Sequence, residues 1–151
     1  MCGIGVVMGD DSVYRKHRDD LLRYAAALVG PHRADDVLSA LVLRVLARGG
    51  FGRLRDPRPY LFRAVLNEAR NTLGRDRSYP LEDDVVERES PAADPTVLDA
   101  VLELPPRQRA AAYLVYWQGE TVEDAAGLMR CRPGTVKRYL HLARRRLKEV
   151  L

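Results

Sequence analysis

Apolar residues recur along this chain with the three- and four-residue spacing of α-helices, in blocks that glycine and proline separate. Two blocks cover residues 12–30 and 34–48, and a third covers residues 60–73 and ends at residues 74–76. Each block predicts a helix with one buried face. The second places Asp35 and Asp36 in its first turn, where negative charge favours the helix dipole. Its expected buried residues are Val37, Leu38, Leu41, Val42, Val45 and Leu46.

The last quarter of the chain, residues 121–151, predicts two helices joined by a tight turn. The Thr121 hydroxyl can cap a backbone N–H, and Asp124 completes a variant of the capping box. Pro133 suits the first position of the second helix, because its missing N–H has no partner there anyway. The apolar stripes of the two helices consist of Val122, Ala125, Ala126 and Met129, then Val136, Leu140, Ala143 and Leu147.

The opposite face of the second helix is basic, with lysines, arginines and a histidine between residues 137 and 148. A short capped helix, a three-residue turn and a basic second helix form the pattern of a helix-turn-helix. In that motif the second helix enters the major groove and its cations neutralise phosphates. The alternative is a solvated basic helix on the surface of a helical protein, and the capped start and small-residue stripe favour DNA binding over it.

The segments between these helices divide the chain. Residues 51–59 form an arginine-rich loop, and residues 78–96 are acidic and contain three prolines. Further helices are predicted at residues 97–103 and 107–118. We therefore expect an all-α fold of two small helical domains, the first a bundle of three to four helices. The expected boundaries are a tail at 1–11, a domain at 12–77, an acidic flexible linker at 78–96 and a second domain at 97–151.

Charge follows the same division. Residues 1–77 carry 14 Lys/Arg against 9 Asp/Glu, residues 78–100 carry 1 against 7, and residues 101–151 carry 10 against 5. Two basic blocks on either side of an acidic strip are typical of two nucleic-acid-binding modules joined by a linker. The expected partner is thus a nucleic acid.

Other classes of function find little support. The 2 cysteines and 3 scattered histidines predict no zinc site, and no glycine-rich phosphate loop or catalytic constellation occurs, so we expect neither cofactor nor enzymatic activity. No apolar run has the length of a membrane span, so no membrane insertion is expected. Without a signal peptide or a disulfide framework, the expected location is the cytoplasm.

Several segments together resemble the bacterial RNA polymerase sigma factors of the extracytoplasmic-function (ECF) type. ADDVLSALVLRVL resembles the helix with which that family grips the polymerase clamp. RDPRPYLFRAVLNEARN resembles the helix that melts and reads the −10 promoter element. LPPRQR, the glycine after the next helix, and PGTVKRYLHLARRRL follow the order and spacing of the domain that reads the −35 element.

The resemblance implies three sets of site residues. Those for the −35 element are Thr135, Lys137, Arg138, His141, Leu142, Arg144 and Arg145. Those for the −10 element, where unstacked bases are captured, are Arg53, Arg55, Arg58, Arg63, Asn67, Arg70 and Asn71. Those for polymerase binding are Asp35, Asp36, Ser39 and Leu43. The implied partners are core RNA polymerase, promoter DNA and an anti-sigma factor or another regulatory protein.

The chain departs from the family pattern at several of these positions. Ser39 and Ala40 replace a glutamine and an acid on the clamp-binding helix. Arg130 and Arg132 replace a glycine and a capping serine in the turn, and Leu142 replaces an arginine. Two alternatives therefore remain at this level: a helix-turn-helix regulator that no longer engages core polymerase, and a helical partner-binding protein held by an anti-sigma factor.

Overall fold

The computed structural model describes residues 2–76, 100 and 102–150. Over these residues the chain is helical, which confirms the expected all-α class. The N-terminal helices are α1 (Cys2–Val29), α2 (Pro31–Ala47), the short 3₁₀ helix η1 (Phe51–Arg53) and α3 (Pro57–Asp76). The C-terminal helices are α5 (Pro106–Ala112), η2 (Tyr113–Trp117), α6 (Val122–Met129) and α7 (Pro133–Val150). The predicted linker at 78–96 and most of the predicted helix at 97–103 lie outside the described residues.

The N-terminal helices begin earlier than the periodicity predicted. Residues 2–11, expected to form a tail, continue α1 because elongating an existing helix adds one hydrogen bond for each residue that becomes ordered. Helix α2 starts at Pro31, directly after Gly30, whose φ of 88° reverses the chain. The prediction that Asp35 and Asp36 occupy its first turn was wrong, since both come after that turn.

Helix α3 is longer than expected at both ends. It begins at Pro57, so Arg58 belongs to its first turn and not to the preceding loop, and it runs through Gly74 to Asp76. A proline is well suited to open a helix, and a single glycine costs only about 1 kcal/mol within one. Within the predicted loop, residues 51–53 form a 3₁₀ turn that buries Phe51.

The helix-turn-helix prediction is confirmed in detail. The backbone N–H of Asp124 donates to the Thr121 hydroxyl over 3.0 Å, and α7 begins at Pro133. Arg130 ends α6 in the left-handed conformation, with φ 56°, which a glycine would adopt at lower cost. The helix predicted at 107–118 instead changes from α5 into the π-helical turn η2.

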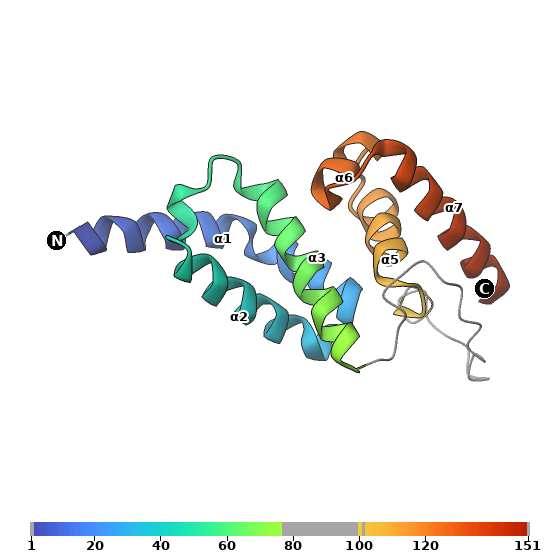
Figure 1. The fold of residues 1–151 in the computed structure, drawn as a ribbon, viewed down its shortest axis with the longest axis horizontal. Helices are drawn as coiled ribbons and strands as arrows, with labels where there is room; N and C mark the ends of the chain where they lie inside the picture. The colour runs from blue at the N-terminus through green and yellow to red at the C-terminus, as the bar shows by residue number, and fades with distance from the viewer. Residues whose placement is uncertain (1, 77–99, 101, 151) are drawn as a thin grey trace.

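One apolar core joins the N-terminal and C-terminal helices. It includes Leu21 and Tyr24 of α1, Phe62 of α3 and Leu114 of η2. The Tyr24 ring stands 5.0 Å from that of Phe62 and 5.8 Å from that of Tyr113. Figure 1 shows α3 between α2 and the C-terminal helices α5 and α6, with α1 crossing behind α3. Helices α1 and α3 both contact α5, so together they form the boundary between the N-terminal and C-terminal helices.

Candidate nucleic-acid and polymerase interfaces

Helix α7 separates an apolar face from a cationic face. Its buried side chains are Val136, Tyr139, Leu140 and Ala143, and a hydrogen bond of 3.3 Å from Arg107 of α5 to the Tyr139 hydroxyl ties the helix to the domain. Of the seven residues expected to read the −35 element, five are exposed: Lys137, Arg138, His141, Arg144 and Arg145. Thr135 and Leu142 are half-buried at the edges of that face. The structure thus brings the whole set together on one helix.

The turn before α7 holds the second cysteine. Cys131 is half-buried against the core, and burial raises the pKa of its thiol, an effect that the nearby Arg107 partly opposes. Its backbone N–H donates to the carbonyl of Ala126 over 3.0 Å, which closes the end of α6. A thiol held neutral in this way is a poor nucleophile. Cys131 therefore packs the turn.

The seven residues expected at the −10 element fall into three groups along α3 and the loop before it. Arg53 and Arg55 are exposed at the loop, and the Arg53 guanidinium lies 5.9 Å from the centre of the Tyr60 ring. Tyr60 itself is half-buried and packs against the core. Arg58 and Arg63, in the first half of α3, are half-buried. Arg58 pairs with Glu120, which lies just before α6, and Arg63 donates to the carbonyl of Gly127 in α6.

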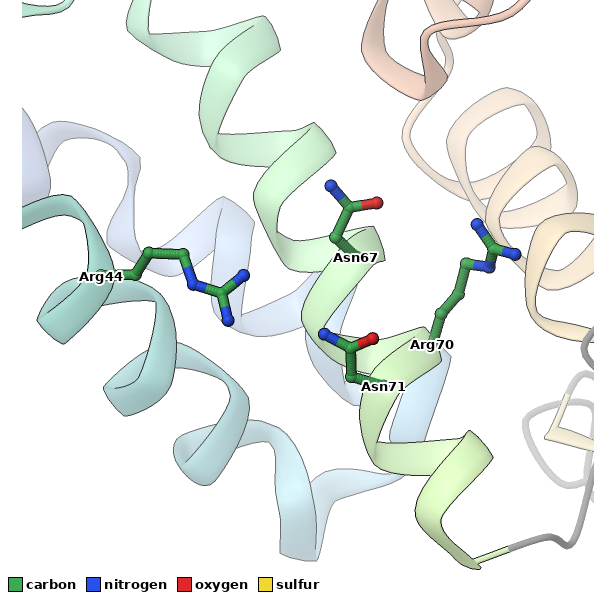
Figure 2. A pocket seen from close by; sticks show the side chains of 4 residues that line it. All are labelled: Arg44, Asn67, Arg70 and Asn71. Atoms are coloured by element: carbon green, nitrogen blue, oxygen red, sulfur yellow. The ribbon is translucent and has the colours of Figure 1, made fainter. Parts of the chain in front are cut away.

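The third group lines a pocket between α2 and α3. Asn67, Arg70 and Asn71 of α3 share this cavity of about 330 Å³ with Arg44 of α2. Figure 2 shows Arg44 and Asn71 directed toward the space between the two helices, whereas Arg70 points away from Arg44. Asn71 comes 13 positions after Arg58, or roughly 20 Å along a helix. The structure therefore does not gather the seven residues into one site.

Arg44 was not among the expected site residues. Its Nη2 atom lies 2.6 Å from Oε1 of Glu68, a carboxylate that is almost fully buried. The geometry is that of an ion pair and not of an aligned hydrogen bond, so this oxygen has no hydrogen-bond partner. The sequence offered one signal for this pair, because Glu68 is an acid on an otherwise apolar helix face. A buried carboxylate of this kind requires a cation nearby.

The four expected polymerase-binding residues share the outer face of α2. Asp35, Asp36, Ser39 and Leu43 are all exposed, and Leu43 leaves 69% of its surface open to solvent. Leu46 was expected in the core, and this was wrong, because it is 48% exposed one turn further along. Two leucines on an open face suit a protein partner better than solvent.

Arg109 of α5 was also missed by sequence reasoning. It is 1% exposed, and its Nε and Nη2 atoms donate to the carbonyls of Leu104 and Leu102 over 2.9 and 2.6 Å. A third donor, Nη1, reaches the carbonyl of Leu28 in the last turn of α1. Since these acceptors are backbone atoms, side-chain pattern gave no indication of them. The buried guanidinium of Arg109 therefore links α5 to α1 through a hydrogen bond.

Within the described residues, no group of three or more His, Cys, Asp or Glu side chains is placed to hold a metal ion. None of the described helices has both the length and the hydropathy required to cross a membrane.

Comparison with known proteins identifies the family. Residues 96–147 match the model for sigma-70, region 4. The RNA polymerase sigma-E factor of Streptomyces coelicolor is 33% identical over 98% of this chain and 89% of its own length. The ECF RNA polymerase sigma factor SigM of Mycobacterium tuberculosis is 32% identical over 93% of this chain and 76% of its own length. The chain belongs to the ECF sigma factors.

A solved structure of this family shares the fold. It is the sigma factor RpoE of Bartonella quintana, crystallised in complex with the anti-sigma factor NepR. That protein is 25% identical to this ECF sigma factor, with a TM-score of 0.63 over 93% of this chain and 94% of the other. The similarity covers the N-terminal as well as the C-terminal helices, and not only the region 4 segment.

Proposed function

We propose that this ECF sigma factor directs core RNA polymerase to promoters, with α7 reading the −35 duplex. The main observation in support of the proposal is the cationic face of α7, the helix that follows the capped helix α6 in the sequence. This face is exposed over three turns. Such a helix fits the major groove, and its flanking arginines meet phosphates. Leu142 can contact a thymine methyl where an arginine would contact guanine.

The N-terminal helices carry the other two tasks in this proposal. The arginines at 53–63 and the polar pocket of α3 take unpaired bases and phosphates of the −10 strand, for which cations, amides and ring faces are suitable. The outer face of α2 binds polymerase through Asp35, Asp36, Ser39 and Leu43. Residues 12–77 and 97–151 then act as two domains joined by the segment at 78–96, and α1 extends the first domain toward the N-terminus.

In this scheme the polymerase performs the chemistry and the sigma factor contributes no catalytic group or cofactor. Its place of action is the cytoplasm, where the polymerase transcribes. An anti-sigma factor is proposed as a regulatory partner, because a related sigma factor has been crystallised with one.

Initiation from a promoter library tests this proposal. The full-length protein is mixed with core polymerase, and the transcripts are sequenced. We expect start sites that share two motifs separated by a constant spacing. Duplex binding without any core-dependent transcript would instead support the regulator that has lost polymerase, an alternative motivated by Ser39 and Ala40.

A further inference from the structure

The turn between α6 and α7 exposes two arginines. Arg130 ends α6, Arg132 directly precedes Pro133, and both are exposed on either side of the half-buried Cys131. In the part of the chain that the structure describes, neither guanidinium has a hydrogen-bond or ion-pair partner. Their charges are therefore open to a partner from outside the chain.

Both arginines occupy positions at which another residue would suit the fold better. Arg130 has φ 56° and ψ 54°, the left-handed conformation that glycine adopts without strain. The carbonyl of Arg132 accepts from the backbone N–H groups of Thr135 and Val136 over 2.9 and 3.2 Å, so Arg132 is the capping residue of α7. A guanidinium has only donors, and it cannot accept from a free N–H as a serine would. Strain of this kind is kept most readily where the side chain has a function.

The turn continues the cationic face of α7 toward its N-terminal end. Gly134, in the first turn of α7, is exposed, and a side chain there would meet no atom within 4 Å. Lys137 and Arg138 follow on the next turn, and both are exposed. In a helix-turn-helix complex the second helix lies in the major groove and the first crosses the backbone, so the turn between them passes close to phosphates.

We propose that Arg130 and Arg132 bind the phosphate backbone of the −35 duplex beside the first turn of α7. The proposal rests on the proposed function, because it requires α7 in the major groove. Arginine holds phosphate oxygens through parallel N–H donors, and such a contact reads no base. The two arginines therefore add affinity without sequence preference, and they make binding more sensitive to salt because each contact releases counterions.

Arg130→Gly tests the contact, because it removes one cation and also relieves the left-handed backbone. Fluorescence anisotropy at several salt concentrations measures the affinity of the full-length protein for the −35 duplex and for a scrambled one. We expect the two affinities to fall by the same factor, and the slope of log Kobs against log salt to become shallower by about 1. The unfolding temperature should rise by roughly 2–4 °C. Weaker binding by a more stable protein excludes unfolding as the cause.

Three further variants complete the comparison. Arg132→Ser supplies an acceptor for the start of α7, so it should again give a shallower slope and a higher unfolding temperature. Arg130→Lys keeps the cation and should keep the wild-type slope. Arg15→Gln removes one charge from an exposed position on α1, away from α7, and should leave the slope unchanged.

Wild-type salt slopes in both Arg130→Gly and Arg132→Ser would overturn the proposal. An equal change of slope in Arg15→Gln would do the same, because net charge alone would then explain the loss. Reduced affinity for core polymerase with unchanged duplex binding would assign the turn to a protein partner and would also contradict the phosphate contact.

The selectivity of the wild-type protein separates this proposal from the proposed function. If the wild type prefers the −35 duplex to the scrambled one and the turn variants keep its slope, only the phosphate contact is wrong. If the wild type has no preference between the duplexes, α7 does not read the −35 element, and the proposed contact is wrong with it.

Discussion

At the scale of single residues, the side chains of α7 divide by what surrounds them. Arg138 is exposed on the cationic face, whereas Arg107 of α5 is engaged with the Tyr139 hydroxyl. Of the two, only Arg138 lies on the cationic face of α7. Selective contact with promoter DNA is therefore expected from Arg138 and its neighbours on α7.

Arg138→Ala should reduce discrimination between the preferred −35 element and a scrambled one by roughly 1–3 kcal/mol, the range for a good base contact. Competition binding to both duplexes at fixed salt measures this difference. Lys148→Ala is the control, because it removes one charge from the last turn of the same helix. It should weaken binding to both duplexes equally. The same equal loss for Arg138→Ala would show that Arg138 does not contribute to base selectivity.

At the scale of helix pairs, the packing of α2 against α3 contains the ion pair of Arg44 and Glu68. Arg44→Ala would leave a buried carboxylate without its cation and should reduce the free energy of unfolding by about 2 kcal/mol. Urea unfolding followed by circular dichroism measures the loss. The double variant Arg44→Ala/Glu68→Gln should recover part of it, because a neutral amide is easier to bury. Equal losses of unfolding free energy in the single and the double variant would contradict the unpaired carboxylate of Glu68 as the cause.

The outer face of α2 is expected to bind polymerase. Asp36→Ala should lower the affinity for core polymerase several-fold, while binding to an isolated −35 duplex remains unchanged, since α2 and α7 make separate contacts. Interferometry with immobilised core and a duplex titration provide the two readings. Asp19→Ala, an exposed acid on α1, is the control. Unaltered core affinity in Asp36→Ala would argue against α2 as the docking helix.

At the scale of the whole molecule, stability should depend on pH through His17 of α1. Burial lowers its pKa from 6.5, and Lys16 and Arg58 lower it further, while Asp20 acts in the opposite direction. Between the folded pKa and 6.5 the unfolded chain binds more protons, so acidification favours unfolding. The free energy of unfolding should therefore fall as the pH decreases from about 7.5 to about 5.5.

Urea titrations across this range test the role of His17. His17→Gln should flatten the dependence, whereas His141→Gln, at an exposed position on α7, should retain it. A wild-type stability that does not change over the range would show that His17 is not the group responsible.

Much of the fold followed from local pattern. The helix-turn-helix was predicted from Thr121, Asp124 and Pro133, because capping and the start of a helix depend on hydrogen bonds within a few residues. Helix ends were less certain. Residues 2–11, predicted as part of a tail, belong to α1, and the first residues of α3 were predicted as a loop, since helix elongation depends weakly on the side chains involved.

The sequence by itself determined the helical class, the cationic face of α7 and most of the exposed face of α2, because these depend on periodicity along single helices. The tertiary structure decided which of the many arginines are engaged. Arg58, Arg63 and Arg109 find acceptors 62, 64 and 81 positions away, two of them backbone carbonyls. A carbonyl is present in every residue, so no pattern of side chains indicates which one an arginine will reach. Only the packing of the C-terminal helices on α1 and α3 makes that choice.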